Sequence, residues 1–136
     1  MRYDPSNVID RQSDTAWRVP GDGVGESLTI DFSQPAILVE IHLIPGYDKI
    51  DPYDGTDRFY QNRRVKRVRF EFSDGTSQEG DLRDDRSLQM LQIRPVLTSS
   101  VRIVILETYE PLASQPRDFT PISEIVMIGG LPVNTP

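Results

Sequence analysis

Residues 67–82 read Arg67-Val-Arg-Phe-Glu-Phe-Ser-Asp-Gly-Thr-Ser-Gln-Glu-Gly-Asp-Leu82, and they give the clearest indication of the fold class. Its first half alternates apolar and charged residues, which is the period of a β-strand with one buried face. Asp74-Gly75 follows directly, and this dipeptide accepts the positive φ angles that a tight hairpin turn requires. Gln78–Leu82 then returns as a second strand. The stretch therefore predicts an antiparallel β-hairpin.

The same period of two recurs along most of the chain. It predicts further strands at Leu28–Phe32, Ile37–Leu43, Leu88–Ile93, Val101–Leu106 and Ile122–Ile128. Val101–Leu106 is apolar at nearly every position, as expected for a central strand covered on both faces. No segment has the pattern of a long amphipathic helix. Seven or so strands joined by polar turns predict an all-β fold, an antiparallel β-sandwich of jelly-roll type.

Length and composition narrow the class of protein. The 136 residues fit a single domain, which we place at residues 1–130, with residues 131–136 as a flexible tail. The formal net charge of −6 disfavours nucleic acid and anionic membranes as partners. The longest apolar runs are too short to cross a bilayer, so we expect no membrane insertion by this domain. The chain has no cysteine, and we expect a monomer.

The connection between residues 45 and 63 is too long for a simple hairpin turn, and it is rich in aspartate and aromatic residues. A loop of this length in a compact domain is usually functional or disordered, and its aromatic content argues for order. Sugars stack on aromatic rings, while planar polar groups bind their hydroxyls. The alternative is that the aromatics pack the loop onto the sandwich and its charges pair among themselves. For a ligand surface, the predicted contacts are Tyr47, Lys49, Arg58 and Tyr60, helped by Arg18 and Arg117 from neighbouring loops.

A second informative stretch is Asn7-Val-Ile-Asp-Arg-Gln-Ser-Asp-Thr-Ala-Trp17, together with Glu124 on the last predicted strand. The pattern resembles the discoidin, or galactose-binding-like, β-sandwich family of carbohydrate-binding modules. Residues 19–30, 43–49 and 54–64 further resemble the subgroup of NADase-type glycan-binding domains. Those domains occur in secreted or membrane-anchored bacterial proteins, often actinobacterial ones. The resemblance extends from Tyr3 to Gly129.

This resemblance implies one structural Ca²⁺, a cation that oxygen ligands bind. Carried over by position, Asp10, Thr15 and Glu124 would supply side-chain oxygens, and Asn7, Gln12 and Ser123 backbone carbonyls. The alternative is that Asp10 and Thr15 only cap the turn and that Glu124 pairs with an arginine. Arg11 stands where many relatives have glycine, and a neighbouring cation would weaken metal binding.

Two further features have a structural and a functional interpretation. Trp17, the only tryptophan, can fill the core at the base of the first turn or serve as a stacking platform, and we favour the core. Arg63, Arg64, Lys66, Arg67 and Arg69 form a basic run. Alternation places Arg67 and Arg69 on a solvent face, where Glu79 and Asp81 across the hairpin can pair with them. A solvated ion-pair ladder is favoured over a phosphate or sulfate site.

The sequence offers little for catalysis. It has one histidine, His42, and no Gly-x-Ser-x-Gly elbow, P-loop or cysteine nucleophile. We therefore expect a non-enzymatic carbohydrate-binding module that recognises a glycan or cell-surface polysaccharide. It would be an accessory domain of a larger exported or membrane-anchored bacterial protein, outside the cell or at its surface, with the signal or anchor outside this chain. The rival interpretation is a protein–protein or cell-surface adhesion domain of the same fold.

Overall fold

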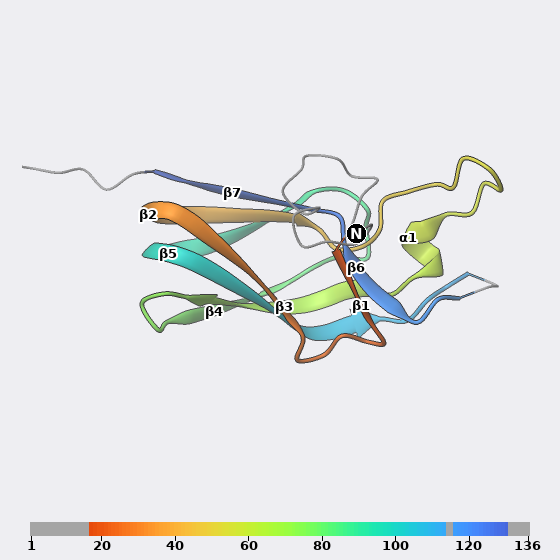
Figure 1. Cartoon of the computed structure of the whole chain (residues 1–136), viewed down its shortest axis with the longest axis horizontal. Coiled ribbons are helices and arrows are strands. Elements are labelled where there is room, and N and C mark those ends of the chain that lie inside the picture. The colour runs from red at the N-terminus through yellow and green to blue at the C-terminus, as the bar shows by residue number, and fades with distance from the viewer. Residues whose placement is uncertain (1–16, 114–115, 131–136) are drawn as a thin grey trace, which may run out of the picture.

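The structure, a computed structural model, describes residues 17–113 and 116–130. Within them the chain forms one helical turn and β-strands that lie in two hydrogen-bonded sheets (Figure 1). The elements are β1 (Trp17–Pro20), β2 (Ser27–Ile44), α1 (Arg58–Gln61), β3 (Arg64–Phe72), β4 (Ser77–Asp81), β5 (Gln89–Tyr109), β6 (Phe119–Ile122) and β7 (Glu124–Gly130). The expected flexible tail, residues 131–136, lies outside the described residues.

All strand pairs are antiparallel. One sheet has the order β4-β3-β5-β2-β7, and β1 pairs with β6 in the other. The predicted hairpin is present as β3 and β4, with Gly75 at φ 88° in its turn. Val101–Leu106 falls within β5, the central strand of the larger sheet, as predicted. The fold is thus the predicted antiparallel sandwich of jelly-roll type.

The two long strands differ from the prediction of four shorter ones. Residues 27–31 of β2 pair with residues 100–104 of β5, whereas residues 36–43 of β2 pair with residues 89–98 of β5. The register shifts between Asp31 and Ala36, and Figure 1 shows both strands reversing direction there, so that their halves lie in opposite layers. Because the two strands pair with each other on both sides of the bend, the four strands expected from alternation are the halves of two bent strands.

The core lies between the two layers. Its members come from both halves of β2 and β5 and from β3, and they include Ile41, Phe70 and Ile103. Trp17 is only 7% exposed and belongs to this cluster. The interpretation of Trp17 as a core residue is therefore confirmed.

The basic run separates into two environments. Arg67 forms the predicted cross-strand pairs with Glu79 at 2.6 Å and Asp81 at 2.8 Å, whereas Arg69 bonds to Glu71 of its own strand. Arg64, by contrast, is 1% exposed. Its guanidinium donates two hydrogen bonds to Asp84, at 2.8 and 2.9 Å, and others to the carbonyls of Asn62 and Glu110. A buried charge is tolerated when it is paired and hydrogen-bonded in this way.

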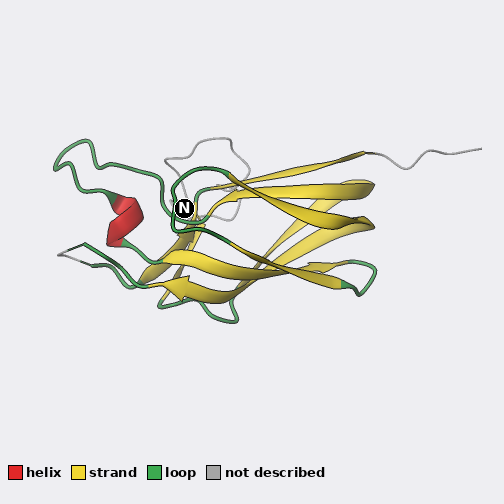
Figure 2. Ribbon diagram, turned by 180° about the vertical axis from the view of Figure 1, so that it is seen from behind, coloured by secondary structure: helices red, strands yellow, loops and turns green. Residues whose placement is uncertain are grey.

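The loops gather at the end of the sandwich opposite the strand reversals (Figure 2). There α1 and the connection that precedes it lie beside the connection between β5 and β6. Leu112 and Ala113 donate backbone hydrogen bonds to Tyr60 O, and Arg117 donates one to Gln61 O. Within the described ranges, no helix is long and apolar enough to span a membrane.

Candidate functional site

The connection from residue 45 to residue 63 is ordered, as predicted. The Asp51 N–H donates to Thr56 O at 2.8 Å, and the Arg58 N–H donates to Lys49 O at 2.8 Å, which closes the loop on itself. Asp57 then caps α1, because its side chain accepts a hydrogen bond from the Phe59 N–H in the first turn. This loop presents side chains to solvent from a backbone that several internal hydrogen bonds hold in place.

A pocket of about 310 Å³ opens at the loop end of the sandwich. This volume is at the lower end of the roughly 300–1,000 Å³ that is usual for small-molecule sites. The long loop, α1 and the β5–β6 connection all contribute to its walls. The lining residues are Tyr47, Lys49, Asp51, Pro52, Tyr53, Arg58 and Arg117.

One wall is held in place by an ion pair. Arg58 donates from Nη2 to Asp51 Oδ2 at 2.5 Å and from Nη1 to Gln61 Oε1 at 2.5 Å. The pKa of Asp51 lies below its ordinary value, first because the Tyr53 N–H donates to its carboxylate and then because Arg58 does. Asp51 is therefore ionised at neutral pH, and the guanidinium plane of Arg58 is fixed against the loop.

Aromatic rings, a proline and two further basic side chains form the rest of the pocket. Tyr53 is 97% exposed at its rim, next to Pro52. Tyr47 is 7% exposed, and the Lys49 ammonium lies 5.9 Å from the centre of its ring. The pocket thus combines a buried ring, an exposed ring and three basic side chains, a set that can stack a sugar ring and donate hydrogen bonds to its oxygens.

Four of the six predicted ligand residues line this pocket, namely Tyr47, Lys49, Arg58 and Arg117. The Tyr47 ring is buried in the pocket wall, whereas Tyr53 presents an exposed ring at the rim. Tyr60 does not line the pocket: its ring contacts Phe59 edge-on at 5.1 Å and lies near the Arg64 and Arg86 guanidinium groups. Arg18 is on β1 and lies 3.9 Å from the centre of the Phe119 ring.

Other polar residues of the loop support the backbone. Asn62 is buried and donates to Arg58 O, and Asp57 pairs with Arg86. Asp51, Pro52 and Tyr53 were not among the six predicted residues. The turn-forming sequence Asp51-Pro-Tyr-Asp-Gly55 could have identified them, because an exposed turn in the middle of a long loop projects its side chains furthest.

The predicted metal site is only partly within the described residues. Asn7, Asp10, Gln12 and Thr15 lie outside them. Ser123 is fully buried, and its hydroxyl donates to Gly46 O and accepts from the Asp48 N–H. Glu124 begins β7 and is 7% exposed. Across the part of the chain that the structure describes, no three His, Asp or Glu side chains are grouped as a metal site.

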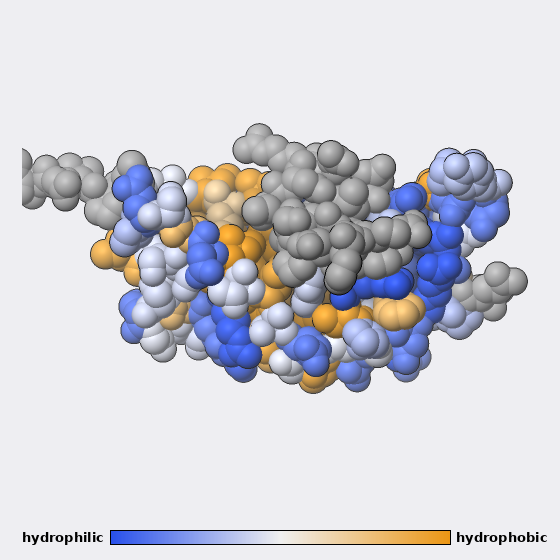
Figure 3. Space-filling view, viewed as in Figure 1, coloured by the Kyte–Doolittle hydropathy of each residue, from blue (hydrophilic) through white to orange (hydrophobic). Residues whose placement is uncertain are grey.

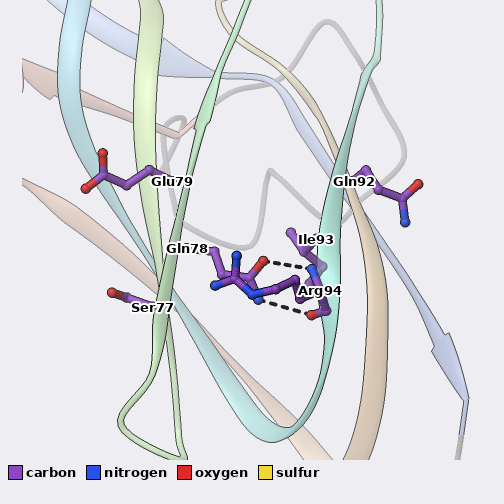
Figure 4. A pocket seen from close by; sticks show the side chains of 6 residues that line it. All are labelled: Ser77, Gln78, Glu79, Gln92, Ile93 and Arg94. Atoms are coloured by element: carbon purple, nitrogen blue, oxygen red, sulfur yellow. Dashed lines mark hydrogen bonds between the residues drawn. The ribbon is translucent and has the colours of Figure 1, made fainter.

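A larger cleft, with a volume of about 430 Å³, lies between β4 and β5. Figure 4 shows the Gln78 side chain reaching across it to the backbone of Arg94. The amide of Gln78 donates to Arg94 O at 3.0 Å and accepts from the Arg94 N–H at 2.8 Å. Glu79 in the same wall is engaged by Arg67. The cleft is therefore bridged by a structural contact between the two layers.

The surface of the molecule differs between its ends. Figure 3 shows predominantly hydrophilic residues over the loop end, and apolar and hydrophilic residues mixed at the opposite end. An apolar groove of about 240 Å³ lies near that opposite end, between β2 and β7, lined among others by Phe32, Leu38 and Met127. The single histidine, His42, bonds to Glu40 on β2 and lines none of these pockets. The loop-end pocket is the one that gathers polar, charged and aromatic groups.

Comparison with solved structures identifies the fold. The chain is 16% identical to module CBM32-3 of a family 31 glycoside hydrolase from Clostridium perfringens, with a TM-score of 0.69 over 95% of this chain and 84% of that one. The family 32 module of Clostridium perfringens NanJ in complex with galactose is 15% identical, with a TM-score of 0.63 over 91% and 83%. The corresponding module of AlyQ in complex with 4,5-unsaturated mannuronic acid is 16% identical, with a TM-score of 0.62 over 91% and 84%.

These identities are low, so the likeness shows a shared fold and not a shared ligand. No curated protein matches the chain. The model of one family does match, over residues 1–128, which is nearly the whole chain. The chain belongs to the NAD glycohydrolase translocation F5/8 type C domain family, a group of non-catalytic discoidin-like domains.

Proposed function

We propose that this chain is a carbohydrate-binding module and that the loop-end pocket is its ligand site. The observation that carries the proposal is the convergence of Tyr53, Lys49, Arg58 and Arg117 on one concave surface. A sugar ring can lie on Tyr53, while the basic side chains donate to its oxygens. The NanJ and AlyQ modules, described with galactose and an unsaturated mannuronic acid, support the class of ligand.

A glycan array followed by titration calorimetry tests this proposal. Tyr53→Ala should abolish or strongly weaken binding of the captured glycan, whereas Tyr53→Phe, which keeps the ring, should retain it. Arg117→Ala should weaken binding, and Arg94→Ala removes the same charge from the β4–β5 cleft as a matched control. Binding that survives both Tyr53→Ala and Arg117→Ala would place the ligand elsewhere.

A specific observation favours the second candidate, a protein-binding or adhesion domain. Ile50 and Leu112 are exposed on the loops that surround the pocket. Exposed apolar side chains at loop tips are common in protein interfaces. If adhesion is the function, Ile50→Ser and Leu112→Ser should reduce attachment to a cell surface, and prior removal of surface glycans with glycosidases should not. If glycan binding is the function, glycosidase treatment should reduce attachment to the cell surface, and the two serine substitutions should not.

We also propose that the domain binds one structural Ca²⁺ and works outside the cell as part of a larger exported bacterial protein. Ser123 and Glu124, the residue before β7 and its first residue, are both buried, and buried carboxylates are usually paired or bound to a metal. Asn7, Asp10, Gln12 and Thr15 would complete the ligand set. The family name, which refers to translocation, supports export. Protease treatment of intact cells that express the full-length protein should remove this domain if it is at the surface.

A further inference from the structure

We infer that the loop-end pocket selects saccharides that carry a negatively charged group. This inference rests on the proposed function and adds the chemical class of the ligand. The pocket has three basic side chains, Lys49, Arg58 and Arg117, and one acidic side chain, Asp51. The chain as a whole has a net charge of −6, so this concentration of positive charge runs against its composition.

The three basic groups have different roles. Arg58 is already committed, because its Nη2 donates to Asp51 at 2.5 Å and its Nη1 to Gln61 at 2.5 Å. Its charge and that of Asp51 compensate each other within the wall. The positive charge that the pocket offers to a ligand therefore comes from Lys49 and Arg117.

Neither Lys49 nor Arg117 forms a salt bridge with a described residue, although carboxylates are plentiful nearby. Asp48 and Asp57 are engaged by Arg86, and Asp118 is engaged by Arg63. Lys49 is oriented over the Tyr47 ring, and the backbone of Arg117 is tied to Gln61 O at 2.8 Å. Both residues are thus held at the pocket while their charged ends remain available.

Two cations on a concave surface concentrate the positive potential where a ligand enters. A guanidinium matches the two oxygens of a carboxylate, sulfate or phosphate, and an ammonium adds a point charge. Pro52 and Tyr53 supply the apolar surface for a sugar ring beside these charges. A neutral sugar could stack on the rings but would leave both cations without a counter-charge. A uronate or a sulfated or phosphorylated sugar could stack on the rings and also supply the counter-charge.

Titration calorimetry with matched oligosaccharides tests this inference. Each acidic oligosaccharide is paired with its neutral counterpart: an oligogalacturonate with its carboxyl-reduced form, and a sulfated and a phosphorylated oligosaccharide with the unmodified forms. We expect the acidic member to bind at least about tenfold more tightly, since hydrogen bonds to charged groups are stronger than those between neutral groups. The preference should shrink as NaCl rises from about 0.02 M to about 0.5 M. The affinities of the three acidic oligosaccharides then show whether the pocket prefers a carboxylate, a sulfate or a phosphate.

The variants Lys49→Met and Arg117→Gln should reduce binding of the acidic member by a larger factor than binding of the neutral member, because only the acidic member loses a charge partner. Arg94→Gln, with the same loss of charge at the β4–β5 cleft, should leave both unchanged. Equal binding of the two members, or an equal loss with Lys49→Met and Arg117→Gln, overturns the inference while the proposed function stands. Absence of binding to every member, with the domain folded, overturns the proposed function as well.

Discussion

Arg58 reaches back seven residues to Asp51, and its Nη2 lies 2.5 Å from the Asp51 carboxylate. The contact joins the only helical turn of the described residues to the turn that carries Tyr53. Asp51 also accepts hydrogen bonds from the backbone of Tyr53 and Asp54, at 2.8 and 3.3 Å. A single carboxylate thus fixes both the guanidinium of the pocket wall and the backbone beneath the most exposed aromatic ring.

The first prediction concerns the contribution of Asp51 to stability at low pH. The pKa of Asp51 in the folded protein lies below its ordinary value of 3.8. A lowered folded-state pKa means that the stabilising contribution is present above about pH 4 and is lost as the pH falls through the folded-state value. Asp51→Asn should therefore lower the melting temperature at pH 7, and its difference from wild type should shrink as the pH falls through the folded-state pKa of Asp51. Asp31→Asn, at an exposed site on β2, controls for loss of one charge. A difference from wild type that does not change with pH would contradict this assignment.

The second prediction concerns the core. Trp17→Ala should reduce the free energy of unfolding by about 3–5 kcal/mol, because the indole is 7% exposed and its removal leaves a cavity. Chemical denaturation measures the change. Glycan binding by the fraction that remains folded should persist, because Trp17 does not line the loop-end pocket. A loss below about 1 kcal/mol together with abolished glycan binding would instead assign the ring to the ligand site.

The third prediction concerns Arg64. Asp84→Ala should cost about 2–3 kcal/mol, because it leaves a buried guanidinium without its only carboxylate partner among the described residues. The double variant Arg64→Met with Asp84→Ala should recover part of this loss, since it removes the buried charge as well. Equilibrium unfolding of the wild type and the two variants measures how much stability is recovered. If the double variant is no more stable than Asp84→Ala, the guanidinium is not the source of the cost.

The fourth prediction compares two adjacent glycines at the end of β7. A Cβ at Gly129 would lie 2.2 Å from Ile37 O on the neighbouring strand, whereas a Cβ at Gly130 would have no atom within 4 Å. Gly129→Ala should therefore force β7 away from β2 and cost on the order of 1–3 kcal/mol. Gly130→Ala should change stability little. Hydrogen exchange of the β7 amides should report the difference, and equal protection in the two variants would argue against the close approach.

The fifth prediction concerns calcium. If the domain binds Ca²⁺, adding the ion should raise the melting temperature by mass action on the folded state. Asp10→Ala and Glu124→Ala should each remove that response. Asp22→Ala, in the turn between β1 and β2, serves as a control that keeps it. A melting temperature that is identical in excess Ca²⁺ and in excess chelator would contradict the metal proposal.

Much of the fold could be predicted from the sequence because the information is local. Side chains alternate across a strand, so the pattern Val68, Phe70, Phe72 is enough to identify a strand with one buried face. Asp74-Gly75 identifies the turn, and the register of the hairpin follows from it. The continuity of β2 and β5 was not predictable in the same way, since a bent strand that crosses between layers leaves the same alternation as two separate strands.

The candidate site was predicted by residue type but not by arrangement. The sequence identified the long loop and its basic and aromatic residues, because their chemistry depends only on the side chains present. Only the tertiary structure decided that Tyr53 is exposed and that Tyr47 is buried, since burial depends on what the rest of the chain places against a ring. It also brought Arg117 beside Lys49, because residues that are distant along the chain meet only where backbone hydrogen bonds between two loops hold them together.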